Sequence, residues 1–192
     1  MLLKEMVEKN RSYRRFYQDV EIKRETLEEL VSLARLSGTG GNRQPIKFFL
    51  SCEQELNAKI FSNTLWAGYL KEWPGPDEGE RPAGYIVIVE DKTIGMVNPR
   101  VDSGIAAQTM LLGAVEKGYG GCMLAALKKK ELHEVLNLPE DKYEILIVLA
   151  LGKPKEEIVI DEVGSDGDIK YWRDENKVHH VPKRSLKDLI IG

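Results

Sequence analysis

The sequence predicts a mixed α/β or α+β protein with one β-sheet at its centre. Three apolar runs are typical of buried strands, namely residues 46–50, 85–89 and 145–150. Segments with apolar side chains at helical spacing lie before and between these runs. The chain has 192 residues, 42% of them hydrophobic, which is enough for one domain with a substantial core. Because strands and helices alternate along the chain, we expect a single sheet flanked by helices.

The first half of the chain is expected to contain three helices. A short one covers residues 3–9 and leads into an arginine-rich segment. A longer one runs from Arg24 to Ser37, where one face carries four apolar side chains: Leu27, Leu30, Val31 and Ala34. Gly38 follows as a stop signal, and residues 53–63 form the third helix.

The middle of the chain combines a loop with a very apolar helix. Residues 73–84 are rich in proline and glycine, which predicts a loop. A helix is expected from Gly104 to Lys117, with Asp102 or Ser103 as its N-cap. Its side chains are apolar almost all round, so most of its surface must be buried in a core or against a partner chain.

The last third of the chain ends in a polar segment. A helix is expected at 128–137, before the central strand at 145–150. From residue 155 onward polar residues dominate, and a hairpin is expected around 174–176. We expect residues 1–192 to form one domain, with 155–192 as a C-terminal extension.

Composition excludes several classes of protein. A formal net charge of −3 and a pI near 5.8 argue against nucleic-acid binding, which usually needs a broad basic face. No apolar run reaches the length of a membrane span, and charged residues near the N-terminus do not fit a secretory signal. A cytoplasmic location is therefore expected. The two cysteines and three histidines match no metal or redox spacing, so no metal site is expected.

A cluster of arginines near the N-terminus is the strongest local signal. Arg11, Ser12 and Arg14 offer guanidinium and hydroxyl donors that suit phosphate oxygens. If the segment is a helical turn, Arg11 and Arg14 share a side and Arg15 points elsewhere. Lys183 and Arg184 form a second basic pair near the C-terminus. If the two ends meet, they form a phosphate pocket. Spacing alone supports a solvated basic turn equally well.

Two glycine-rich segments allow a ligand to approach the backbone. The first is 37–45, where Gly38, Thr39 and two further glycines precede Asn42 and Gln44, whose amides can bind the edge of a heterocycle. The second is 118–126, where small residues would let a flat ring lie against the main chain. A helix end followed by a turn or a tight strand explains each segment as well. Neither segment has the spacing of a P-loop or of a dinucleotide-binding fingerprint.

In this order and at these separations, the motifs resemble the nitroreductase family of FMN-dependent oxidoreductases. The family's Arg-Ser-x-Arg-x-Phe segment is matched by Arg11, Ser12, Arg14 and Phe16. Its Asn-x-Gln-Pro segment is matched from Asn42 to Pro45, with Gly38 and Thr39 in place of a preceding Pro-Ser. Its apolar helix and Gly-x-Gly-x-Cys strand match 104–123, and its Pro-Lys-Arg tail matches 182–184.

The resemblance implies an α+β fold with a central, mostly antiparallel sheet, and an intertwined homodimer with FMN at the subunit interface. It implies that Arg11, Ser12, Lys183 and Arg184 hold the phosphate and that Arg14 lies near the pyrimidine edge of the flavin. Gly38, Thr39, Asn42 and Gln44 would belong to the same site, the two amides approaching from the other subunit. The backbone of Leu124, Ala125 and Ala126 would face the flavin ring, and the segment 155–192 would wrap the partner.

The implied reaction passes a hydride from NADH or NADPH through flavin N5 to a nitroaromatic, a quinone or a similar small acceptor. The flavin carries this chemistry, so no side chain is expected to act as an essential acid or base. Trp66 and Tyr69, beside the 73–84 loop, are candidates for substrate contact or for structural packing. Reductive dehalogenation, flavin breakdown and non-catalytic FMN binding are alternatives for the same site.

Overall fold

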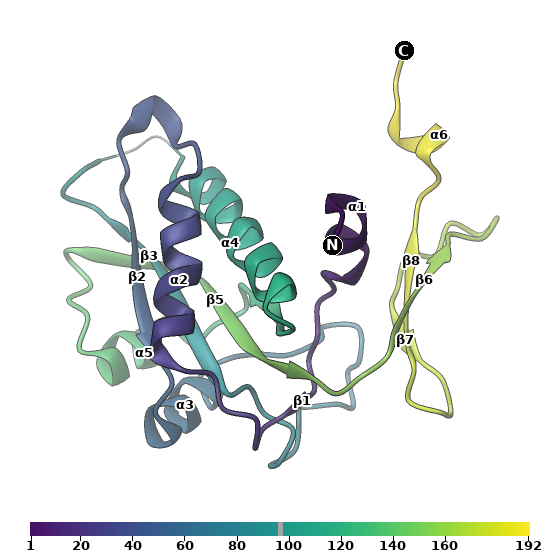
Figure 1. Ribbon diagram of the computed structural model, residues 1–192, viewed down its shortest axis with the longest axis horizontal. Helices are drawn as coiled ribbons and strands as arrows, with labels where there is room; N and C mark the ends of the chain where they lie inside the picture. Colours follow the sequence, from purple (N-terminus) through teal and green to yellow (C-terminus); the bar gives the residue numbers. More distant parts are fainter. Residues whose placement is uncertain (96–97) are drawn as a thin grey trace.

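The structure, a computed structural model, describes residues 1–95 and 98–192. A central antiparallel sheet has the order β2–β3–β5, and β4 and β1 pair one after the other with the free edge of β5 (Figure 1). The strands are β1 (Phe16–Tyr17), β2 (Ile46–Ser51), β3 (Gly84–Asp91), β4 (Gly120–Leu124) and β5 (Tyr143–Pro154). The mostly antiparallel sheet and the α+β class expected from the sequence are thereby confirmed.

Helices cover both faces of the sheet. The helices of the described residues are α1 (Leu3–Lys9), α2 (Arg24–Arg35), α3 (Gln54–Phe61), α4 (Pro99–Glu116), α5 (Lys129–Leu136) and α6 (Leu186–Leu189), with a 3₁₀ turn at Gly40–Asn42. The helices α2 and α4 pack on one face, and α3 and α5 pack on the other. No helix of the described residues is long and apolar enough to cross a membrane.

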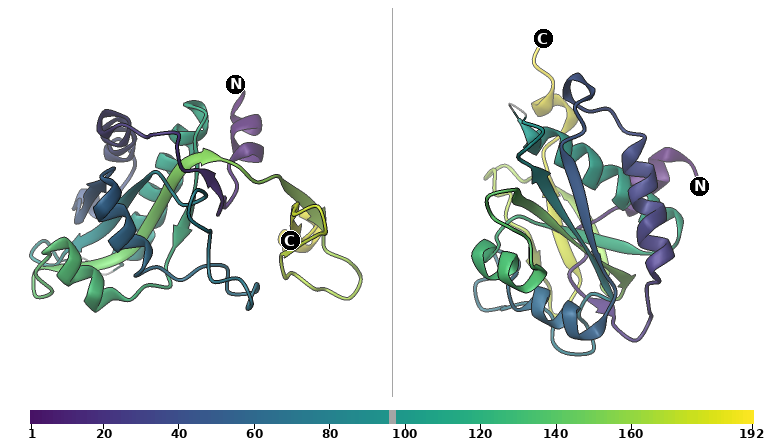
Figure 2. Two further views of the ribbon diagram at one scale, coloured as in Figure 1. Left: turned by 90° about the horizontal axis from the view of Figure 1, so that it is seen from below. Right: turned by 90° about the vertical axis from the view of Figure 1, so that its left-hand side faces the viewer.

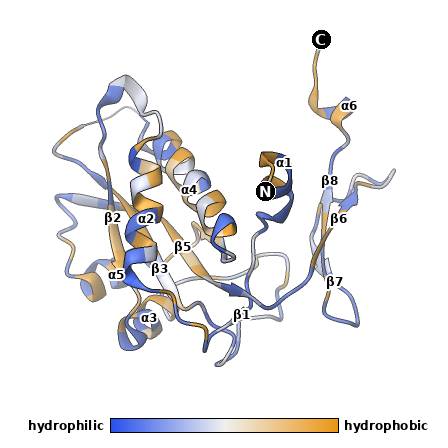
Figure 3. Ribbon diagram, in the orientation of Figure 1, coloured by the Kyte–Doolittle hydropathy of each residue, from blue (hydrophilic) through white to orange (hydrophobic). Residues whose placement is uncertain are grey.

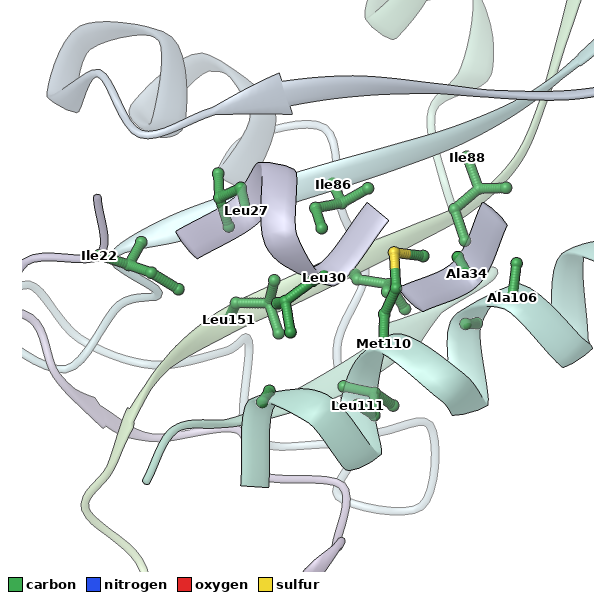
Figure 4. Close-up of a cluster of buried hydrophobic side chains, with 13 residues drawn as sticks. Ile22, Leu27, Leu30, Ala34, Ile86, Ile88, Ala106, Met110, Leu111 and Leu151 are labelled. Atoms are coloured by element: carbon green, nitrogen blue, oxygen red, sulfur yellow. The ribbon is translucent and has the colours of Figure 1, made fainter. Parts of the chain in front are cut away.

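Strand β3 divides the interior into two clusters, because successive side chains point to opposite faces of a sheet. Ile86 and Ile88 join Leu30 and Met110 in the cluster under α2 and α4 (Figure 4). Tyr85, Val87 and Val89 face the cluster under α3 and α5. Every residue of β3 is buried, because the sheet is the middle layer between α2 and α4 on one face and α3 and α5 on the other.

The start of α4 and the end of α2 differ from the sequence expectation. Helix α4 begins at Pro99, whose fixed φ suits a first helical turn, so the expected start at Gly104 is wrong. The expected caps, Asp102 and Ser103, are buried inside the helix, and the Asp102 carboxylate accepts the Gly40 N–H at 3.2 Å. Helix α2 ends at Arg35 in a tight last turn, and Gly38 is not its left-handed stop.

Residues 155–192 form an arm that extends beyond the end of β5. The arm contains β6 (Ile158–Glu162), β7 (Trp172–Arg173) and β8 (His179–Lys183), and it ends in α6. Strand β8 pairs with β6 in parallel and with β7 in an antiparallel hairpin, which confirms the predicted hairpin. The arm lies apart from α2 and α4, on the side of the molecule where α1 is found (Figures 1 and 2).

Gly121 in β4 has no room for a side chain. A Cβ there would lie 2.6 Å from the carbonyl oxygen of Ala150 in the neighbouring strand β5. We expect Gly121→Ala to lower the free energy of unfolding by about 2 kcal/mol, because a backbone atom must move to accommodate the methyl group. Gly68→Ala is the matched control, since nothing lies within 4 Å of its Cβ position. Denaturant unfolding compares the two variants, and equal stabilities would contradict the tight β4–β5 contact.

Candidate functional site

The arginine-rich segment runs beside β4 and is joined to it by an isolated bridge; it does not form a helical turn. Ser12 forms an isolated parallel bridge with Gly121, and the Tyr13 N–H donates to the Gly121 carbonyl at 3.0 Å. A Cβ on Gly120 would lie 2.5 Å from the Tyr13 ring. Close packing against neighbouring segments therefore accounts for Gly120 and Gly121, whereas Gly118 has a φ of 77° where the chain leaves α4.

Arg15 points away from the other arginines of this segment. Its guanidinium forms a two-pronged pair with Glu80 in the 73–84 loop, and Lys155 lies 2.9 Å from the same carboxylate. Hydrogen bonds from Arg15 and Lys155 lower the pKa of Glu80 to about 2. This group of charges connects the 73–84 loop to Lys155, the first residue of the arm.

A second carboxylate, Glu156, is fully buried behind the arginine segment. It accepts the backbone N–H of Arg14 and lies 3.1 Å from the Arg173 guanidinium. Arg173 also lies 4.2 Å above the ring of Trp73. Glu156 thus connects the N-terminal segment to the hairpin of the arm and, through Arg173, to the 73–84 loop.

Between the N-terminal segment and the arm lies a cavity of about 310 Å³, which we call the arginine pocket. Its lining is Asn10, Arg11, Ser12, Arg14, Tyr171, His179, Val181 and Lys183. The two ends of the chain that were expected to meet therefore do so through Arg11, Ser12, Arg14 and Lys183. Arg184 is not part of the lining. No aspartate or glutamate belongs to this lining among the described residues.

Three nitrogen atoms in this lining are buried without a hydrogen-bond partner in the described parts of the chain. They are Nε of Arg11, Nε of Arg14 and Nδ1 of His179. An unpaired buried donor is costly, so such a group indicates a partner that the folded chain does not itself supply. Cationic side chains with unpaired donors, in a lining without a carboxylate among the described residues, fit an anion such as a phosphate.

Aromatic side chains extend the arginine pocket on one side. The Arg14 guanidinium lies 4.7 Å from the centre of the Tyr171 ring. Tyr171 packs against Tyr69 with their ring centres 4.9 Å apart, and half of the Tyr69 surface is exposed. Trp66 is buried in the cluster under α3 and α5, where its indole N–H donates to Thr64 at 3.0 Å. The structure therefore brings Tyr69, and not Trp66, to the edge of the pocket.

The remaining predicted site residues lie elsewhere in the chain. Gly38, Thr39, Asn42 and Gln44 belong to the connection between α2 and β2, which Figure 1 shows on the side of the molecule opposite the arm. Asn42 and Gln44 both have a φ of 53°, and their side chains are exposed. Within one chain, these residues do not meet the arginine pocket.

Residues 124–126 continue from β4 past the arginine segment. Leu124 is buried, whereas Ala125 and Ala126 are exposed, and the Ala126 carbonyl accepts the Leu65 N–H at 3.0 Å. Leu124 lies about 10 Å along the strand from the Gly121 that pairs with Ser12, and Ala125 and Ala126 follow beyond the end of β4. The three residues are outside the lining of the pocket.

Sequence reasoning missed His179, Tyr171 and Glu156. A signal for His179 was present, since side chains two apart in a strand share a face. Once Lys183 is placed on the pocket side of β8, Val181 and His179 must follow it, and all three line the pocket. No group of His, Cys, Asp and Glu among the described residues could hold a metal ion.

Comparisons with known proteins agree with this geometry. The sequence model of the nitroreductase family, described as "Nitroreductase family", matches residues 7–153. A protein of Archaeoglobus fulgidus, named as an NADH dehydrogenase/NAD(P)H nitroreductase, is 26% identical over 150 residues, or 74% of this chain and 80% of that protein.

Solved structures share the fold. An FMN-dependent nitroreductase of Clostridium difficile R20291 is 24% identical with a TM-score of 0.66, and the match covers 81% of this chain and 89% of that one. A nitroreductase family protein of Clostridium novyi NT is 20% identical with a TM-score of 0.66, and the match covers 98% of both chains. The second likeness therefore includes the arm.

Acid should weaken the contact between the 73–84 loop and the arm. The pKa of Glu80 lies below its ordinary value of 4.5 in the folded chain, so the unfolded chain binds this proton first. The contribution to stability is complete above about pH 4.5 and is lost as the pH falls toward 2. We expect Glu80→Gln to cost about 1 kcal/mol near pH 7, after allowance for solvent screening, and to flatten the acid part of the stability curve.

Thermal unfolding between pH 7 and pH 2 measures this effect. Glu78→Gln is the control, because Glu78 is exposed and has no ion pair among the described residues. Coincident curves for the Glu80 variant and the unaltered protein would show that this ion group contributes nothing to stability.

Proposed function

Because the chain belongs to the nitroreductase family, we propose that it is an FMN-dependent oxidoreductase that holds the cofactor phosphate in the arginine pocket. The observation that carries this proposal is the set of unpartnered nitrogens on Arg11, Arg14 and His179. Lys183 adds a cation from the opposite end of the chain. A phosphate dianion brings both the acceptor oxygens and the charge that this lining lacks.

The residues of the chain bind and orient the cofactor. Arg11, Ser12 and Lys183 would contact the phosphate, and Arg14 would lie nearer the pyrimidine edge of the flavin, where a positive charge stabilises the reduced ring. The backbone at 124–126 would approach the ring itself. When bound, FMN supplies the hydride chemistry between NADH or NADPH and a small acceptor. No side chain of the chain is proposed as an essential acid or base.

A second copy of the chain would complete the site as a homodimer. Asn42 and Gln44 do not reach the arginine pocket of their own chain, so they would contribute to the partner's site. Several apolar side chains are exposed on α1, on α4 and at the end of the arm (Figure 3): Leu2, Leu3, Val7, Val101, Ile105, Leu186, Leu189, Ile190 and Ile191. Exposed apolar surface of this extent favours a protein partner, and the arm at 155–192 would wrap it.

The electron acceptor is proposed to be a nitroaromatic, a quinone or a similar planar molecule, in a cytoplasmic setting. Tyr69 supports this class, because its half-exposed ring packs on Tyr171 at the edge of the pocket. An aromatic ring in this place can stack on a planar substrate.

The proposal is tested by the colour and the reactivity of the purified protein. We expect a yellow protein whose flavin is reduced within seconds by NADH or NADPH and is reoxidised by a nitroaromatic or a quinone. Bound flavin that neither donor reduces would instead support a non-catalytic FMN-binding protein. A colourless protein that takes up no added FMN would contradict the proposed cofactor.

Arg11→Ala should weaken FMN binding about ten- to a hundredfold, because a hydrogen bond to a charged group contributes about 1.5–3 kcal/mol. Quenching of FMN fluorescence on binding measures the dissociation constant. Arg24→Ala is the control, since Arg24 pairs with Glu28 on the surface of α2. Unchanged affinity in the Arg11 variant would remove Arg11 from the site.

The two basic residues at the end of β8 should differ in their effects. Lys183 lines the arginine pocket and Arg184 does not. We therefore expect Lys183→Ala to weaken FMN binding about tenfold, by the loss of roughly 1.5 kcal/mol, and Arg184→Ala to change it less than twofold. The same titration measures both, and a larger loss for the Arg184 variant would contradict this placement of the arm.

A further inference from the structure

His179 is a buried residue of the arginine pocket that belongs to none of the motifs on which the family resemblance rests. It begins strand β8, and its side chain shares a face with Val181 and Lys183. None of its surface is exposed to solvent, although it contributes to the lining. Its two ring nitrogens have different surroundings, and this difference assigns a role to each of them.

The first nitrogen, Nε2, lies 3.2 Å from Nη1 of Arg14. A guanidinium group can only donate hydrogen bonds, so Nε2 must accept this one. A neutral imidazole that accepts at Nε2 carries its proton on Nδ1. The contact with Arg14 therefore specifies which tautomer His179 adopts.

The same contact helps to fix Arg14. Nη1 of Arg14 also donates to the Ser12 carbonyl at 3.2 Å, and the guanidinium lies 4.7 Å from the Tyr171 ring centre. With His179, these groups hold the Arg14 side chain from both the N-terminal segment and the arm. Arg14 thus has a defined position before any ligand arrives, which lowers the cost of binding.

The second nitrogen, Nδ1, is buried and has no hydrogen-bond partner in the described parts of the chain. Because this atom carries the proton, it is an unpaired donor on a side chain that lines the pocket. An acceptor atom on a bound ligand would pair it.

The surroundings keep His179 neutral. Burial and the nearby charges of Arg14, Arg173 and His180 lower its pKa to about 4. Arg14 comes from the N-terminal segment, Arg173 from β7 and His180 from β8 itself, while the Tyr171 ring packs 5.2 Å away. Near pH 7 the imidazole is therefore neutral, with an acceptor at Nε2 for Arg14 and a donor at Nδ1.

We propose that His179 both positions Arg14 through Nε2 and donates from Nδ1 to an acceptor atom of the ligand in the arginine pocket. The identity of that ligand, FMN, rests on the proposed function, whereas the contact with Arg14 does not. His179 is then a residue through which the arm recognises the cofactor, in addition to Lys183. The pocket selects a ligand that is anionic and also presents an acceptor oxygen or nitrogen opposite Nδ1.

Two variants separate the two roles. In His179→Gln a side-chain carbonyl can reach the position of Nε2, so the contact with Arg14 is kept and the donor at Nδ1 is lost. In His179→Asn an amide can take the place of Nδ1, so the donor is kept and the contact with Arg14 is lost. We expect each variant to bind FMN about five- to tenfold more weakly than the unaltered protein, as the loss of one hydrogen bond implies.

The matched control is His180→Gln. His180 lies on the other face of β8, where its Nδ1 is 2.9 Å from Asp161 and its ring stacks on Trp172 at 4.2 Å. We expect this variant to bind FMN as the unaltered protein does. Equal affinities for all three variants and the unaltered protein would overturn the assignment to His179.

Nitrogen-15 NMR of the histidine side chains reads the tautomer directly, with His179→Gln identifying the signal. We expect His179 to be protonated at Nδ1 in the flavin-free protein, and the Nδ1–H resonance to shift when FMN is added. Protonation at Nε2 would overturn the contact with Arg14. An Nδ1–H resonance that FMN leaves in place would overturn the donation to the ligand.

The two proposals can fail separately. A protein that binds no FMN would contradict the proposed function together with the donation from Nδ1 to FMN. The tautomer of the flavin-free protein would still confirm or contradict the positioning of Arg14.

Discussion

Glu156 lies where β5 ends and the C-terminal arm begins, and its side chain is completely buried. Removing one partner from a buried charge pair is strongly destabilising, so the groups around this carboxylate must stay in place. These groups are the backbone N–H of Arg14 and the guanidinium of Arg173. Through them Glu156 joins the N-terminal segment to β7 of the arm, and the arginine pocket lies between this segment and the arm.

The carboxylates also divide the basic residues into two groups. Glu80 pairs with Arg15 and Lys155, and Glu156 pairs with Arg173. These three cations therefore stabilise the fold and already have carboxylate partners. The side chains of Arg11, Arg14 and Lys183 remain on the pocket side without a carboxylate partner among the described residues. A chain of formal net charge −3 thus concentrates unpaired positive charge in one small cavity. Such a local field attracts an anion although the protein as a whole is acidic.

A single chain supplies one half of the proposed flavin site. The arginine pocket lies between the sheet and the arm, whereas Asn42 and Gln44 lie at the far end of α2. Under the proposed homodimer, the exposed apolar side chains of α1, α4 and the arm would be covered by the same contact that brings the two halves together. Cofactor binding and assembly would then depend on each other, because each proposed ligand site would take residues from both chains.

The sequence by itself determined the local elements and the class of the fold. The helical spacing of apolar residues placed α2, and continuous apolar runs placed the central strands, since a strand buried on both faces needs apolar side chains along its whole length. Residue type also identified Arg11, Ser12, Arg14 and Lys183 as candidates for a phosphate pocket, and the structure brings them to one cavity. The start of α4 was misjudged because Asp102 could serve as a cap locally, whereas in the fold it accepts the Gly40 N–H.

Only the tertiary structure decided how these candidates are held. Glu156, Tyr171 and His179 lie far along the chain from Arg14, and their importance comes from contacts that no local pattern records. The tertiary structure also brings Tyr69, but not Trp66, to the edge of the arginine pocket. In the same way it places Lys183, but not Arg184, in the lining, although each pair is close in sequence. The physical reason is the same in each case: side-chain type is a local property, whereas burial and hydrogen-bond partners depend on which distant segments fold together.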